Sequence, residues 1–249
     1  MGRAAGFRPR AERGQQRALE RQRREQEEAH LRFLRRLDHE IKNPLTAIRA
    51  ALANLPGSPE GSALSGVQSQ VDRLARLSAD LRKLAALERQ PLEQEPVDLT
   101  ELLTELLALG RERPQADQLR LRLSLPQAPW PLPCVAGDRD LLYLAFHNLL
   151  DNALKFARSG DTLEIRAFED GSWVVVEVAD TGPGVPQEEL PHLGEELYRG
   201  RAARGAEGSG LGLALVRAVV ARHQGLFSVR SRLEEGTVVS VRLPAGSAR

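Results

Sequence analysis

The stretch Leu31–Leu55, LRFLRRLDHEIKNPLTAIRAALANL, repeats its apolar residues at steps of three and four, which predicts one face of a long amphipathic helix. This apolar stripe consists of Leu31, Leu34, Leu37, Ile41, Leu45, Ile48, Leu52 and Leu55. At roughly 100° per residue, His39 lies on the opposite face, with Glu40 beside it and Asn43 one turn later. Pro44 removes an N–H and crowds the Glu40 carbonyl, so we expect a bend beside the histidine. Taken alone, the pattern fits an ordinary surface histidine equally well, and motifs further along the chain decide between the two interpretations.

Length and composition limit the function classes. The chain has 249 residues, is 41% hydrophobic and 28% charged, and carries a net charge of +1, which argues against a broad nucleic-acid-binding surface. The single cysteine, Cys134, excludes an internal disulfide framework. No apolar run reaches the length of a membrane helix, and Met1–Gln22 is arginine-rich without the apolar core of a signal peptide. We therefore expect a cytoplasmic chain without a membrane span.

A second amphipathic segment follows the turn signal Pro56–Pro59. Its apolar residues are Leu64, Val67, Val71, Leu74, Leu77, Leu81, Leu84 and Leu87. Two helices joined by a short turn form an antiparallel hairpin over residues 31–90, preceded by a basic tail and helical lead-in over residues 1–30, in which 1–14 is expected to be flexible. No third element covers the two stripes, so we expect a homodimer packed as a four-helix bundle.

A linker over residues 91–97 separates this hairpin from a second domain over residues 98–249, where the pattern changes to alternating helices and strands. The expected helices are Val97–Arg113, Asp138–Ala157 and Gly210–His223. The expected strands are Leu119–Leu125, Thr162–Phe168, Trp173–Ala179, Leu226–Arg232 and Thr237–Leu243. Turn signals make the middle pair and the last pair of strands into hairpins. The prediction is an α+β layer: a mostly antiparallel sheet with helices on one face.

Three polar residues share one face of the helix Asp138–Ala157. Asn148, Asn152 and Lys155 lie at i, i+4 and i+7. Carboxamide oxygens suit Mg²⁺, and a lysine suits a phosphate. Asparagine is disfavoured in helix interiors, so two of them hint at a ligand, although an ordinary helix surface remains the alternative.

The segment Asp180–Gly184, DTGPG, follows an apolar strand. A carboxylate at the end of such a strand is desolvated unless it has a partner, and the exocyclic amine of adenine would be a good donor to Asp180. Gly182 and Gly184 let the backbone turn closely around a ligand. A purely structural turn would use the same residues.

The segment Gly208–Leu213, GSGLGL, opens the last predicted helix, where free N–H groups form an anion site for β- and γ-phosphates. It matches neither the Walker A loop nor the dinucleotide fingerprint, and alone it is a weak signal. The segment between these two glycine clusters, Val185–Glu207, is loop-like and could close over a nucleotide, with Arg199 stabilising the phosphoryl group. A solvated charged loop is the alternative.

The order and spacing of these segments resemble the sensor histidine kinases of two-component signalling over roughly residues 30–245. DHEIKNPLT (38–46) is similar to the family's H-box, NLLDNALKF (148–156) to its N-box, DTGPG (180–184) to its G1 box and GSGLGL (208–213) to its G2 box. The resemblance implies a dimeric helical bundle followed by an α/β sandwich of the Bergerat type that binds ATP and Mg²⁺. It also implies transfer to the receiver domain of a response regulator.

By this resemblance, His39 attacks the γ-phosphoryl group of ATP, Glu40 accepts the ring proton and Asn43 orients water when the regulator is dephosphorylated. Asn152 would bind Mg²⁺ with help from Asn148, while Lys155 and Arg199 would contact phosphates. Asp180 would recognise the adenine amine. The remaining residues expected to contact the nucleotide are Gly182, Gly184, Gly208, Ser209, Gly210, Leu211 and Gly212.

The chain also departs from the family pattern. Many members carry a phenylalanine pair in the lid, where this chain has Leu193, Leu197 and Tyr198. Residues 1–30 are too few to form a separate sensing domain, so we expect the signal to come from a separate sensor protein docking on residues 15–36 or from sensing within the dimer. Two other functions stay open: a serine kinase or simple ATPase of the same nucleotide fold, and a non-catalytic or phosphatase-biased regulator that binds ATP.

Overall fold

The computed structural model describes residues 10–53, 60–89, 91–126, 131–203 and 208–246. The predicted turn at Pro56–Pro59, most of the predicted flexible tail and Glu207 lie outside these ranges. In chain order the elements are α1 (Arg10–Ala53), α2 (Glu60–Arg89), β1 (Glu95–Val97), α3 (Leu99–Arg111), η2 (Ala116–Gln118), β2 (Arg120–Ser124), β3 (Val135–Gly137), α4 (Arg139–Phe156), β4 (Thr162–Asp170), β5 (Trp173–Asp180), η3 (Leu190–His192), η4 (Arg201–Ala203), α5 (Gly212–Arg222), β6 (Leu226–Arg232) and β7 (Gly236–Pro244).

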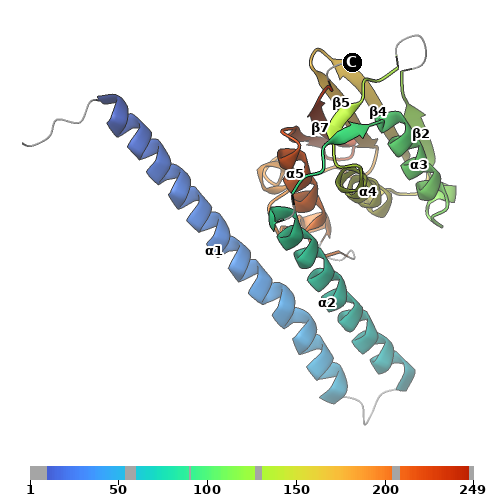
Figure 1. The fold of residues 1–249 in the computed structure, drawn as a ribbon. Helices are drawn as coiled ribbons and strands as arrows, with labels where there is room; N and C mark the ends of the chain where they lie inside the picture. Colours follow the sequence, from blue (N-terminus) through green and yellow to red (C-terminus); the bar gives the residue numbers. More distant parts are fainter. Residues whose placement is uncertain (1–9, 54–59, 90, 127–130, 204–207, 247–249) are drawn as a thin grey trace, which may run out of the picture.

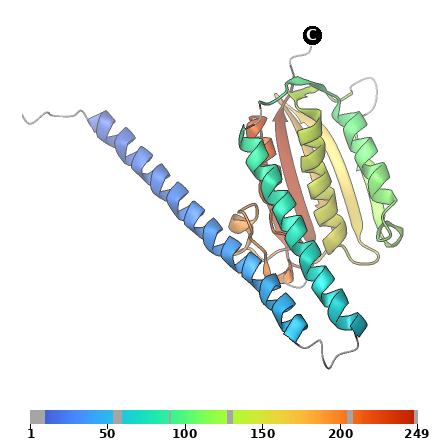
Figure 2. The ribbon, with the colours of Figure 1, turned by 60° about the horizontal axis from the view of Figure 1, so that its bottom comes forward.

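Helices α1 and α2 form the predicted hairpin (Figure 1), and α2 lies beside the helices of the sheet domain (Figure 2). α1 begins at Arg10, so residues 10–14 are helical and the prediction of a flexible tail up to residue 14 is wrong there. The helix runs through Pro44 without interruption, and Pro44 is buried. The first turn after the proline is supported by the Thr46 hydroxyl, which donates to the Lys42 carbonyl at 2.8 Å.

The second part of the chain is built on a five-stranded sheet of order β2-β4-β5-β7-β6. Every pairing in it is antiparallel except that of β2 with β4, which is parallel. The predicted, mostly antiparallel sheet is therefore confirmed. The predicted linker, in contrast, contains β1, which pairs with β3 in a separate two-stranded sheet. Neither three-residue strand is long enough to show alternation in the sequence.

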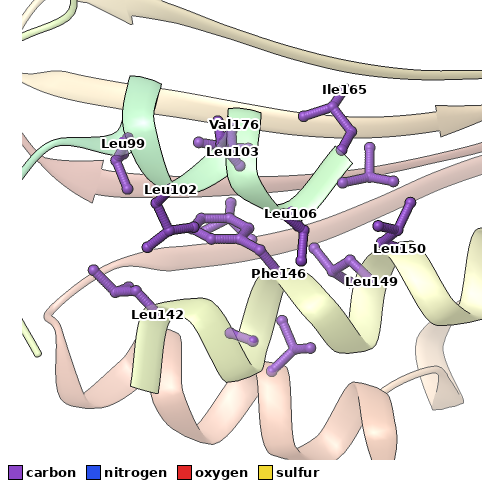
Figure 3. Close-up of a cluster of buried hydrophobic side chains, with 14 of the residues drawn as sticks. Leu99, Leu102, Leu103, Leu106, Leu142, Phe146, Leu149, Leu150, Ile165 and Val176 are labelled. Atoms are coloured by element: carbon purple, nitrogen blue, oxygen red, sulfur yellow. The ribbon is translucent and has the colours of Figure 1, made fainter. Parts of the chain in front are cut away.

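Helices α3, α4 and α5 lie against one face of this sheet, as Figure 2 shows. The core between them contains leucines from both α3 and α4, with Phe146 at its centre (Figure 3). Leu102 of α3, Phe146 of α4 and Ile165 of β4 are each 0% exposed. The alternate residues Val174, Val176 and Val178 of β5 face this core from the sheet, and β5 is the central strand, buried along most of its length.

Aspartates mark the starts of two of these helices. The Asp98 carboxylate accepts from the Thr100 N–H at 2.7 Å and so begins α3. The Asp138 carboxylate accepts from the Leu141 N–H at 3.0 Å and so begins α4. Each cap is worth about 1 kcal/mol. The first helix of the second domain was predicted to start at Val97, which is two positions before the actual start of α3 at Leu99, because Val97 belongs to β1.

A buried histidine connects the end of α5 to the start of α4. The Nδ1 atom of His223 lies 2.8 Å from the Val219 carbonyl, and its Nε2 accepts the Asp138 N–H at 3.0 Å. Because Nε2 must be an acceptor, the ring is neutral with its proton on Nδ1. Burial lowers the pKa of His223, which favours the same neutral state.

Candidate functional site: a cavity between the sheet domain and the hairpin

A cavity of about 540 Å³ lies beside α4, at the end of β5 and under the glycine-rich start of α5. Nearly all the site residues predicted in the second domain line it: Asn148, Asn152, Lys155, Asp180, Gly184, Arg199, Gly208, Ser209, Gly210 and Gly212. Gly182 is buried directly behind Asp180, whose carboxylate accepts its N–H at 2.9 Å. The cavity therefore brings together residues that are far apart in the sequence.

The amide pair on α4 faces the glycine loop. The Asn148 side-chain N–H donates to the Leu144 carbonyl at 2.7 Å, so its Oδ1 points elsewhere. A Cβ placed on Gly212 would come within 3.1 Å of that Oδ1 and 3.7 Å of the Asn152 Nδ2. Gly212 thus allows α5 to start directly against both amides. Within the described ranges no group of three His, Cys, Asp or Glu side chains could hold a metal ion. A cation here would therefore be held by the amide oxygens of the asparagines together with oxygens of a molecule bound in the cavity.

Asp180 is half-buried at the end of β5. Burial raises the pKa of its carboxyl, and the N–H groups of Gly182 and Thr237 oppose this by hydrogen bonding to the charged form. The turn that follows needs glycine at Gly184, because its φ is +69° and a Cβ would lie 1.9 Å from the Arg232 carbonyl oxygen. A carboxylate held in this way can accept a hydrogen bond from a ligand amine in the cavity.

The glycine loop bends sharply before α5. Gly210 has a φ of +77°, and a Cβ there would meet the Tyr198 carbonyl oxygen at 3.1 Å. The Ser209 hydroxyl accepts the Leu211 N–H at 3.2 Å. No side chain of the described residues caps the start of α5, and Gly210 and Gly212 at that start line the cavity. The Leu211 side chain is fully buried and lies outside the cavity, so only its backbone could contact a ligand.

The lid segment, residues 185–207, is described up to Ala203 and packs against the hairpin (Figure 2). Leu197 is 4% exposed with a φ of +59°, and it forms a cluster with Leu77 of α2 and Leu211. Arg36 of α1 forms an ion pair with Glu195 at 2.7 Å and lies over the Tyr198 ring. The lid is thus docked on both hairpin helices. Of the two leucines that stand where many family members carry a phenylalanine pair, Leu197 packs against the hairpin and Leu193 lines the cavity.

Arg199 has a second set of neighbours besides the cavity. Its guanidinium donates to the Ala203 carbonyl, and desolvation lowers its pKa, with Glu40 opposing and Arg73 adding to this effect. Arg73 forms an ion pair with the Glu40 carboxylate at 2.6 Å. Arg199 therefore lies where the lid meets the charged residue next to His39.

His39 and Asn43 are exposed on α1, and neither is among the described residues that line the cavity. The prediction of an outward-facing imidazole is confirmed. In this arrangement the structure brings the second-domain residues together but keeps the histidine apart from them.

Sequence reasoning missed one side of the cavity. Arg76, Asp80 and Lys83 of α2 line it, and they lie at i, i+4 and i+7 along one edge of the apolar stripe. This is the same spacing as that of Asn148, Asn152 and Lys155, so the signal was present. Only the docking of two segments far apart in the sequence shows that both faces serve one cavity.

Two family profiles match the chain in the order that the fold suggests. Residues 29–90 match the His Kinase A (phospho-acceptor) domain, and residues 137–247 match the histidine kinase-, DNA gyrase B- and HSP90-like ATPase. The chain belongs to the sensor histidine kinases. The first match covers the hairpin with His39, and the second covers the cavity.

Curated relatives of this histidine kinase cover most of its length. The signal transduction histidine-protein kinase BaeS of Escherichia coli is 34% identical over 85% of this chain and 46% of its own length. The histidine-protein kinase/phosphatase MprB of Mycobacterium leprae is 32% identical over 88% of this chain and 44% of its own length. The chain thus spans about half the length of the curated relatives it matches.

Solved histidine kinase structures share the fold. The mycobacterial sensor histidine kinase MprB is 30% identical with a TM-score of 0.53, and covers 61% of this chain and 98% of its own. The complex of histidine kinase ThkA with response regulator protein TrrA gives a TM-score of 0.73 at 21% identity, covering 93% of this chain and 66% of its own. Among the described helices of this histidine kinase, none is both long and apolar enough to cross a membrane.

Proposed function

We propose that this chain is an ATP-dependent protein-histidine kinase that phosphorylates itself on His39 and passes the phosphoryl group to an aspartate of a response regulator. One observation carries the proposal: the chain combines an exposed imidazole on a helical hairpin with a cavity whose asparagines, aspartate and glycines suit a nucleotide. We also propose a division into a lead-in over residues 1–30, a hairpin module over 31–90, a linker over 91–97 and an ATP module over 98–249.

In the proposed complex, Asp180 accepts a hydrogen bond from the adenine amine, because its carboxylate is held at the cavity wall by the turn. Asn152, assisted by Asn148, would hold Mg²⁺, which neutralises charge on the phosphates. Lys155 adds a point charge beside Gly208, whose position would bring a Cβ within 2.6 Å of the Lys155 Nζ. The start of α5 contributes backbone N–H groups.

In the transfer step, a ring nitrogen of His39 forms a bond to the γ-phosphorus while the bond from that phosphorus to the β–γ bridging oxygen breaks and ADP leaves. The proton on the other ring nitrogen goes to Glu40. The phosphoryl group then moves to a regulator aspartate. Because His39 does not line the cavity here, the ATP module must first leave its docked position.

The expected partners follow from the same features. The hairpin stripe stays exposed in the single chain, with Leu31 at 50% and Leu45 at 45%, which supports a homodimer through a four-helix bundle. This chain shares the fold of histidine kinase ThkA, which was solved in complex with response regulator protein TrrA, and this supports a response regulator as a partner. The kinase/phosphatase name of the MprB relatives and the exposure of Asn43 support dephosphorylation of the regulator as well.

The decisive experiment incubates the purified chain with γ-labelled ATP and Mg²⁺ and compares wild type with His39→Ala and Asp180→Asn. Wild type should acquire label that is lost in acid and kept in base, because a phosphoramidate is acid-labile. His39→Ala should acquire none, and Asp180→Asn should lose labelling by at least about 100-fold through weaker ATP binding. Label that survives acid or persists in His39→Ala would favour a serine kinase, and nucleotide binding without any label would favour a non-catalytic regulator.

A further inference from the structure

The second helix of the hairpin places a carboxylate on the glycine loop. The Asp80 Oδ2 atom accepts a hydrogen bond from the Ser209 hydroxyl at 2.6 Å, across 129 positions of sequence. The same hydroxyl accepts the Leu211 N–H at 3.2 Å. Asp80 also lines the cavity, and its side chain is 30% exposed. A negative charge from the hairpin is therefore connected, through one serine, to the start of α5.

This is the position where a nucleotide would place its own negative charge. The beginning of a helix with uncapped N–H groups attracts anions, and the phosphates of the proposed ATP complex would lie there. Asp80 and a triphosphate would repel each other, since partly buried charges are only partly screened. Arg76 and Lys83, on the same face of α2, line the cavity too and would attract the phosphates.

We propose that Asp80 occupies the phosphate subsite of the ATP module from within the chain, so that ATP must displace it. This inference rests on the proposed function, because it takes the glycine loop to be the phosphate site. Its consequence is a competition: the ATP module binds either the α2 carboxylate or the triphosphate at this loop.

The competition extends to the whole docked arrangement. Leu77 lies one turn before Asp80 on α2 and is buried against Leu197 of the lid and Leu211 of the loop. Displacing Asp80 from Ser209 therefore also loosens the apolar contact that holds the lid to the hairpin. Nucleotide binding and release of the ATP module from α2 become one linked equilibrium.

The test measures the affinity of the whole chain for ATP, ADP and adenosine by titration calorimetry with Mg²⁺ present. Asp80→Asn keeps the size of the side chain and an oxygen that can accept from Ser209, but removes the charge. ATP affinity should rise by about fivefold to tenfold, ADP affinity by less, and adenosine affinity should not change, because the repulsion grows with phosphate charge. The control is Asp72→Asn, a charge removal on the same helix at an exposed residue that does not line the cavity.

Equal ATP affinities for Asp80→Asn and wild type would overturn the inference. So would an equal gain for ATP and adenosine, since that pattern indicates a general opening of the cavity without a charge effect. A wild-type chain that binds none of the three ligands would overturn the proposed function together with this inference. The absence of any binding distinguishes that outcome from failure of the inference alone.

A second measurement tests the link to docking. Arg36→Ala removes the ion pair to Glu195 and the contact with Tyr198, and Arg36 lies on α1 whereas Asp80 lies on α2. Because coupling between two binding equilibria is reciprocal, weaker docking should raise ATP affinity by about twofold to fivefold. The gain of the double variant Arg36→Ala with Asp80→Asn should be smaller than the product of the single gains. An unchanged ATP affinity in Arg36→Ala would overturn the competition with docking.

Discussion

The hairpin and the sheet domain use the same apolar residues at the same helical spacing, yet they bury them to different extents. In the sheet domain Leu102 and Leu106 of α3 are 0% exposed, because the sheet and α4 cover them. In the hairpin Leu31 and Leu52 of α1 are each 50% exposed, because α2 covers only part of the stripe. Periodicity thus predicts which face of a helix is apolar, while the number of layers packed against that face decides whether it is buried from solvent.

This comparison implies that the two regions depend on different partners for stability. The sheet domain has its complete core within one chain, whereas the apolar stripe of the hairpin stays partly exposed in the single chain and would be covered by a second copy in the proposed homodimer. Three predictions test the difference.

The largest effect is expected in the sheet domain. Phe146→Ala should reduce its free energy of unfolding by about 3–5 kcal/mol, since the ring is fully buried between α3, α4 and the sheet. Urea denaturation followed by tryptophan fluorescence measures the change. The matched control is Phe168→Ala on the outer face of β4, where the ring is 39% exposed and the loss should be about 1 kcal/mol or less. Equal losses of unfolding free energy in the two variants would contradict the prediction that the buried ring contributes more to stability than the exposed one.

The second effect concerns self-association of the hairpin. Leu45→Asp places a charge in the stripe that a second copy would cover, and should weaken dimerisation by about 100-fold or more. Light scattering during gel filtration over a range of protein concentrations measures the mass. Ala50→Asp, on the polar face of the same helix, should leave the mass unchanged. A dimer that persists in Leu45→Asp would mean that the stripe is covered in some other way.

The smallest effect is a dependence of stability on pH. Burial lowers the pKa of His223 below its ordinary value of 6.5. Above that pH the ring is neutral in both the folded and the unfolded chain, so it contributes no pH dependence. As the pH falls below 6.5, the unfolded chain gains a proton that the folded chain resists, so the free energy of unfolding should decrease.

Urea denaturation at several pH values between about 5 and 8 tests this by comparing wild type with His223→Gln. The wild type should lose more stability on acidification than the variant, which lacks the titrating ring. Burial lowers the pKa of His147 as well, but this histidine is present in both proteins and cancels in the difference. Parallel pH curves would contradict the prediction.

Much of this architecture is predictable from local patterns. The hairpin stripes, the two strand hairpins and the helix that carries Asn148 and Asn152 each have a period or a turn signal of their own. The outward position of His39 follows from its angle to the stripe. These features depend on residues close together in the chain, so sequence alone is sufficient.

The features that were missed depend on contacts between distant segments. β1 pairs with β3, across about forty positions, in strands too short to show alternation. The role of Asp80 depends on Ser209, and the burial of Leu211 depends on Leu77 of the hairpin. The neutral His223 depends on the start of α4. No local pattern distinguishes these residues from ordinary surface or core positions.

The backbone at Leu197 gives the docked lid a particular character. A leucine with φ of +59° occupies the left-handed region, which costs roughly 1–2 kcal/mol relative to ordinary backbone. Burial of its side chain against Leu77 and Leu211 offsets this cost only while the lid is docked. When the lid leaves the hairpin, the backbone at Leu197 can adopt an ordinary conformation and the strain is released. The docked lid should therefore open faster than its buried apolar area alone would suggest.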